Sequence, residues 1–126
     1  MKIRIASALI FAGLLTAGLA SAECVYPKAP ASIPDGKTAT EEQMVAGMRA
    51  VKEYNTQVTA YLNCLDLQMQ TDISAAGAEA PPETIAQIKA INAKRHNAAV
   101  EELESHAARF NEQVKSYKTR DKEKKS

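Results

Sequence analysis

The feature that most constrains this chain of 126 residues is a single pair of cysteines, Cys24 and Cys64. Both lie beyond residues 1–22, whose positive start, apolar run and small-x-small exit at Ala22 are typical of a cleaved export signal. A cysteine pair in an exported chain most simply forms a disulfide. We therefore expect a soluble periplasmic or secreted protein, cleaved after Ala22, with an intramolecular Cys24–Cys64 bond. Pairing between two molecules and two free thiols are the alternatives.

A heptad pattern predicts a first helix from about residue 40 to about residue 70. Thr38 or Thr40 would cap its start, and Thr40 forms a capping-box pattern with Gln43. Apolar residues then follow at alternating spacings of four and three, with Asn55 as the single strongly polar member. This seam consists of Met44, Met48, Val51, Asn55, Val58, Leu62, Leu65 and Met69.

A second helix is predicted from about residue 82 to about residue 118. Two consecutive prolines end the loop before it, and proline suits the first turn of a helix. The apolar positions that continue the seam on this helix are Leu103, Phe110 and Val114. We also expect Asn55 to pair with Asn92 across the two helices, because a buried polar pair can fix their register.

Two long helices joined by a short loop predict an all-α fold, an antiparallel, coiled-coil-like hairpin. Residues 23–39 precede it as an extended arm, because their three prolines disfavour helix. Cys64 lies about 36 Å along the first helix, and the arm spans about 50 Å at most. The cysteines therefore meet only if the arm reverses at Pro34-Asp35-Gly36 and runs back along that helix. Closing this loop of about 40 residues stabilises the fold by roughly 4 kcal/mol.

Residues 119–126 are predicted to form a basic tail that frays beyond the second helix. The segment 115–126 holds six basic and two acidic residues, whereas the mature chain as a whole is near neutral. Basic residues suit the C-terminal end of a helix, where they oppose its dipole. The alternative is a weak contact between this tail and an anionic surface. Export and the near-neutral body argue against nucleic acid as a partner.

The residue patterns of common catalytic and cofactor sites are missing from the sequence. It contains no Cys-x-x-Cys, no glycine-rich phosphate loop and no Gly-x-Ser-x-Gly elbow. His96 and His106 fall on different faces of one helix, and Glu102 with His106 would make only a weak surface metal pair. The seam methionines are interpreted as core packing rather than as soft metal ligands. We therefore expect a chain that is not an enzyme, without catalytic residues, metal or cofactor.

Three motifs carry a resemblance to a known group of proteins: Cys24-x-x-Pro27, Pro34-Asp35-Gly36 and Tyr61-Leu62-x-Cys64. With them the chain resembles small, uncharacterised secreted proteobacterial proteins that have a Cys/Pro-rich start and a helical-hairpin body. The resemblance covers about residues 24–65, with general helicity after that. It implies a compartment and an architecture, and it carries no activity with it.

Two helices do not cover both sides of a four-heptad seam, and leftover apolar surface normally finds a partner. We therefore predict a non-catalytic exported protein that acts in protein–protein interaction or structural assembly in the cell envelope. Its partner would be a second copy or an envelope protein, bound through the seam together with Leu103, Phe110 and Val114. The alternative is a periplasmic protein that binds a small ligand or a metal.

Overall fold

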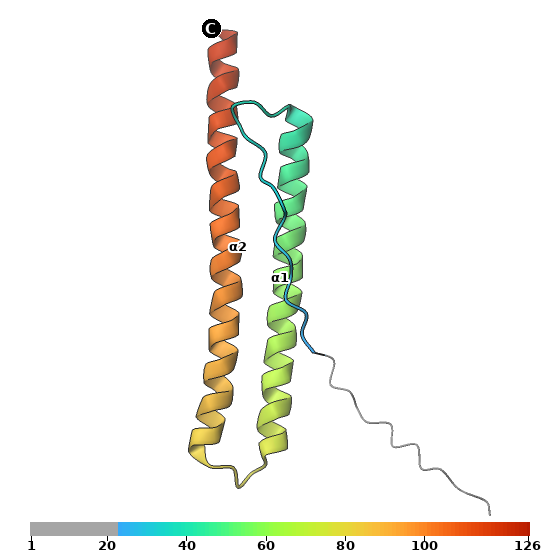
Figure 1. Ribbon diagram of the computed structural model, residues 1–126, viewed down its shortest axis with the longest axis vertical. Coiled ribbons are helices and arrows are strands. Elements are labelled where there is room, and N and C mark those ends of the chain that lie inside the picture. The colour runs from blue at the N-terminus through green and yellow to red at the C-terminus, as the bar shows by residue number, and fades with distance from the viewer. Residues whose placement is uncertain (1–22) are drawn as a thin grey trace, which may run out of the picture.

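The computed structural model describes residues 23–126, which form two packed helices and an extended arm. Helix α1 spans Glu41–Ala76 and helix α2 spans Pro82–Lys125, and the two run antiparallel as a hairpin (Figure 1). The predicted all-α hairpin is confirmed. The predicted export signal, residues 1–22, and its cleavage site lie outside the described residues. Within residues 23–126, neither helix combines the length and the apolar character needed to cross a bilayer.

Both helices begin where local chemistry predicts. The Gln43 amide donates to Thr40 Oγ1 at 3.2 Å, and the Thr40 amide donates to Gln43 Oε1 at 2.9 Å. This reciprocal capping box makes Thr40, rather than Thr38, the N-cap of α1. Helix α2 begins with Pro82 at its first position, where a missing amide hydrogen costs nothing.

Helix α1 continues past residue 70, and its predicted end is wrong. Thr71 and Ser74 were expected to lie in the loop, but their hydroxyls donate to carbonyls four residues earlier at 3.0 and 2.9 Å. Because these hydroxyls are satisfied within the helix, they do not terminate it. The helix ends instead at Gly77, whose φ of 86° is accessible to glycine at little cost.

Helix α2 also continues past its predicted end at about residue 118, so residues 119–125 are helical rather than frayed. Arg120 Nη1 donates to the Ala39 carbonyl oxygen at 2.9 Å, and the guanidinium lies 4.6 Å from the centre of the Tyr117 ring. The hydrogen bond to Ala39 fixes the end of α2 against the entry to α1. Beyond them α2 overhangs α1, as predicted, at the end marked C in Figure 1.

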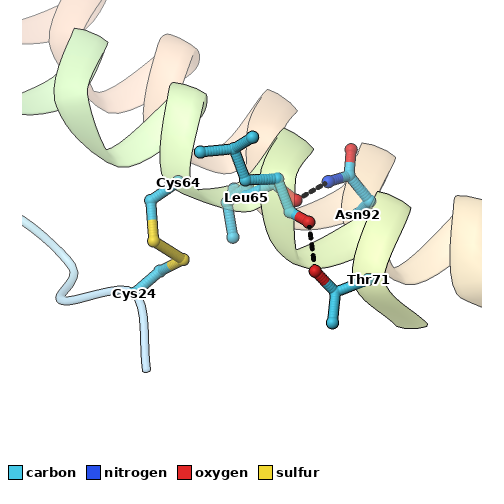
Figure 2. Close-up of a disulfide and its surroundings, with 6 residues drawn as sticks. Cys24, Cys64, Leu65, Thr71 and Asn92 are labelled. Atoms are coloured by element: carbon cyan, nitrogen blue, oxygen red, sulfur yellow. Dashed lines mark hydrogen bonds between the residues drawn. A yellow bond between two sulfur atoms is a disulfide. The ribbon is translucent and has the colours of Figure 1, made fainter. Parts of the chain in front are cut away.

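The predicted disulfide and the predicted route of the arm are both confirmed. Cys24 and Cys64 are bonded, with their Cα atoms 5.7 Å apart (Figure 2). The arm turns at Asp35, whose carbonyl oxygen accepts the amides of Thr38 and Ala39 at 3.1 and 2.7 Å. Figure 1 shows the arm running alongside α1 and crossing to α2 near this turn.

Two glycines allow the arm to lie against both helices. Gly36 is buried, its amide donates to Gln113 Oε1 at 2.9 Å, and a Cβ there would lie only 1.9 Å from the Gln113 carbonyl oxygen. At Gly47 a Cβ would lie 2.7 Å from Pro34 Cγ and 2.8 Å from Phe110 Cε2. Larger residues at these positions would push the arm away from α2 and from α1.

The core is therefore built from three layers rather than two. One cluster of buried residues lies near the turn of the arm, and the other lies towards the disulfide. Arm residues pack against both clusters, namely Ile33 against the first and Cys24 and Ala29 against the second. The first cluster is Ala39, Met44 and Phe110, and the second is Tyr54, Val58, Tyr61, Leu65 and Ala99.

The buried face of α1 is rotated away from the predicted seam. Tyr54 and Tyr61 lie about 40° and 60° to one side of Val58, whereas Asn55 lies about 60° to the other side. Tyr54 is 2 % exposed, but Asn55 is exposed and Met48 is 42 % exposed. The rotation follows from the arm, because it covers the side of α1 that carries the two tyrosines.

Candidate interaction surface

The arm-covered face is held together by Tyr26, which contacts both helices. Its hydroxyl donates to Glu102 Oε2 on α2 at 2.6 Å, and its ring meets the Tyr61 ring of α1 edge-on, with centroids 5.1 Å apart. The hydrogen bond to the carboxylate, together with partial burial, raises the pKa of Tyr26 above its ordinary range. The arm therefore covers this face of the two helices, while Val25 and Tyr26 of the arm itself remain 83 % and 42 % exposed.

A buried histidine lies beneath this face. His106 is 3 % exposed, and its ring packs edge-on against the Tyr54 ring with centroids 5.7 Å apart. Burial lowers the pKa of His106, Arg109 lowers it further, and Glu102 opposes them. Burial also raises the pKa of Tyr54, whose buried hydroxyl has no hydrogen-bond partner among residues 23–126. The side chain of His106 lies inside the core, so it is not placed to form a surface metal pair with Glu102.

The opposite face of the hairpin carries a groove that no arm residue lines. We call it the arm-free groove; its volume is about 610 Å³, and apolar side chains from both helices form its floor. The arm does not reach it because the arm lies along the other side of the helix pair. The lining residues are Val51, Lys52, Asn55, Thr56, Leu103, Glu104 and Ala107.

The structure divides the predicted seam between the core and this open face. Four members are buried in the core: Met44, Val58, Leu65 and Phe110. Five are half-buried: Val51, Leu62, Met69, Leu103 and Val114. Two are exposed, Met48 and Asn55. Part of the apolar repeat is thus left at the surface even though the arm adds a third layer.

The predicted pairing of Asn55 with Asn92 is wrong. Asn92 Nδ2 donates instead to the Leu65 carbonyl oxygen at 2.9 Å, as Figure 2 shows. Asn55 is exposed and lines the arm-free groove. A polar contact does fix the level of α2 against α1, but its acceptor is a backbone carbonyl rather than a second asparagine.

Sequence reasoning missed the aromatic side of the core, although the sequence contains a signal for it. Tyr54, Val58, Tyr61 and Leu65 follow each other at spacings of four, three and four, which is the same repeat in a second register. On α2, His106 occupies a heptad position between Leu103 and Phe110. On α1 the second register shares Val58 and Leu65 with the predicted seam. The position of the arm decides which of the two registers is buried.

The described part of the chain holds no group of three or more His, Cys, Asp or Glu side chains that could bind a metal ion. A comparison with family models, curated proteins and solved structures found no significant match to the chain. The functional proposal therefore rests on the geometry of the chain itself, in particular on the arm-free groove.

Proposed function

We propose that the chain is a non-catalytic exported protein that acts through protein–protein contacts in the cell envelope. The observation that carries the proposal is the asymmetry of the hairpin. The arm closes one face, whereas the other face exposes part of an apolar heptad repeat. Half-buried Val51 and Leu103 lie at its groove. Met48 lies seven residues before Asn55 and so on the same side of α1, and it is 42 % exposed. Apolar surface of this kind on helices is typical of a face that packs against another helix.

The disulfide supports the exported part of the proposal. A bond between residues 40 positions apart holds the arm in place, and such bonds persist mainly in oxidising compartments. The same bond bears on the interaction face, because it keeps the arm on the side of the tyrosines. The arm-free groove then stays open to a partner.

Site-specific photo-crosslinking in the periplasm tests the proposal. A photoreactive residue at Met48 should yield adducts that mass spectrometry identifies as an envelope protein or as a second copy. The matched control is Leu67, an apolar residue that is 65 % exposed on the outer side of α1. Adducts at residue 48 and none at residue 67 would support an interaction face. Equal adducts at both positions, or none at residue 48, would contradict it.

Native mass spectrometry separates this proposal from the alternative of a small-ligand or metal binder. The protein should be isolated from its own periplasm without denaturation, so that any bound species is retained. An added mass equal to a polypeptide supports the interaction function. An added mass of a metal ion or small molecule, with no polypeptide, would overturn it in favour of the alternative.

A further inference from the structure

The arm-free groove is bordered by charges that alternate in sign along each helix. On α1 three exposed charged residues are spaced 11 and 14 apart, close to three and four whole turns, so they share one edge. On α2 the corresponding spacings are 15 and 14, each close to four turns. The α1 rim consists of Glu41, Lys52 and Asp66, and the α2 rim consists of Lys89, Glu104 and Lys118.

The two rims match in level along the hairpin. Lys52 and Glu104 line the same groove at its middle. The hydrogen bonds made by Asn92 and Arg120 fix the level of α2 against α1, one on each side of this middle pair. From the turn of the arm to the loop, the α1 rim therefore reads minus, plus, minus, while the α2 rim reads plus, minus, plus. Among residues 23–126 no ion pair links the two rims within one copy.

We propose that the arm-free face is an interface between two copies of this chain, related by a two-fold axis parallel to the helices. This axis places the α1 rim of each copy against the α2 rim of the other at the same level. It creates three pairs of opposite charge, each occurring twice: Glu41 with Lys118, Lys52 with Glu104, and Asp66 with Lys89. The inference rests on the proposed function, since it names the partner that the face accepts.

The charges also exclude the other way in which the helices can align. A two-fold axis perpendicular to the helices, centred on the groove, would place Glu41 opposite Asp66 and Lys89 opposite Lys118. Like charges would then face each other at both ends of the interface. Electrostatic complementarity of this type fixes the orientation of an interface more than its affinity.

The size and composition of the face suit a stable dimer. The two ends of the α1 rim lie 25 residues apart, about 37 Å, and two adjacent helices are about 20 Å wide, so the face covers roughly 700 Å² per copy. Standard interfaces bury about 800 Å² per partner. Val51, Leu103 and Ala107 give this face an apolar centre, and the charged rims surround it, which is the usual anatomy of an interface.

Charge reversal tests the proposed pairing in the full oxidised protein. By sedimentation equilibrium, Lys52→Glu and Glu104→Lys should each weaken dimerisation roughly tenfold, because each variant brings like charges together twice. An equimolar mixture of the two variants should recover wild-type affinity, because the mixed dimer restores both opposite-sign pairs. The matched controls are Lys94→Glu and Glu101→Lys, which make the same changes on the outer side of α2.

Two results would overturn the inference. One is a wild-type chain that stays monomeric, and the other is a mixture that associates no better than the single variants. Spin labels at Ala78, in the exposed loop, report the axis: we expect them within about 25 Å of each other, whereas the perpendicular axis would separate them by on the order of 80 Å. A monomer that is still crosslinked through Met48 to another envelope protein would overturn the dimer and leave the proposed function standing.

Discussion

Removing the disulfide should cost the protein a large part of its stability. The change is the double substitution Cys24→Ala with Cys64→Ala, which deletes the bond and leaves no free thiol. The bonded residues lie 40 positions apart, so the bond removes the closure entropy of a long loop from the unfolded chain. That entropy corresponds to about 4 kcal/mol at 25 °C. A small domain is typically stable by about 5–15 kcal/mol, so a loss of about 4 kcal/mol is at least a quarter of the total.

The arm determines whether the full loss is observed. Without the bond, the arm is still held near its start by the hydrogen bond from Tyr26 to Glu102 and by the packing of Tyr26 on Tyr61. The hydrogen bond from Tyr26 to Glu102 is exposed and contributes only about 1 kcal/mol. If the arm stays docked, the folded state of the variant buries the same surface as the wild type. If the arm is released, the folded state buries less surface, and the slope of a denaturation curve falls.

Urea denaturation followed by circular dichroism at the helical band measures both effects. We expect the unfolding free energy to fall by about 3–4 kcal/mol relative to the oxidised wild type, with the denaturation midpoint moving to lower urea. The matched control is Ala60→Ser, a comparably small change at an exposed position of α1. A loss below about 1 kcal/mol would refute the reasoning that the disulfide is a main support of this fold.

Three further predictions concern single side chains. Gly36→Ala should destabilise the fold by about 1–3 kcal/mol in the same urea assay, because the new Cβ would lie 1.9 Å from a backbone carbonyl oxygen of α2; an unchanged midpoint would contradict the close approach. For His106, burial lowers the folded-state pKa, so its contribution to stability is complete above the ordinary value of about 6.5 and is lost as pH falls below it. His106→Leu should therefore flatten the dependence of unfolding free energy on pH below about 6.5, and an unchanged slope would contradict it. Arg120→Ala should release the end of α2, because it deletes the hydrogen bond to the Ala39 carbonyl oxygen; faster amide exchange in residues 119–125 and unchanged exchange around His106 would confirm it.

Local chemistry made part of this fold predictable. The capping box at Thr40 and the proline at the first position of α2 depend on residues that are neighbours in sequence, so their pattern decides the outcome. The route of the arm was also predictable, because chain length leaves only one way for Cys24 to reach Cys64. These features need no knowledge of what packs against them.

The helix ends were not predictable from composition. Threonine and serine are common in loops, yet the hydroxyls of Thr71 and Ser74 are hydrogen-bonded within α1, so the helix continues to Ala76. At the other end, Arg120 holds α2 in place through the backbone of Ala39, 81 residues earlier in the chain. A contact between such distant positions leaves no trace in the local sequence.

The candidate surface was predictable only in part. The heptad repeat located the helix–helix contact, but two registers overlap in α1, and they differ in whether Tyr54 or Asn55 is buried. The arm selects the register with Tyr54 because it covers that side of the helix. The same choice leaves Asn55 and Met48 at the open face. The open face is therefore a consequence of three-layer packing, which a pattern for two helices does not contain.

Hydroxyl-radical footprinting of the oxidised protein at increasing concentration tests the central claim most directly. The claim is that the arm closes one face of the hairpin and leaves the other face for a partner. We expect Tyr54 and Tyr61 to be protected at every concentration, since they are 2 % and 7 % exposed beneath the arm. Met48, 42 % exposed, should react in dilute solution and become protected as a second copy covers it. Reactive tyrosines in dilute solution would contradict the account, whereas a Met48 that reacts equally at all concentrations would overturn the dimer.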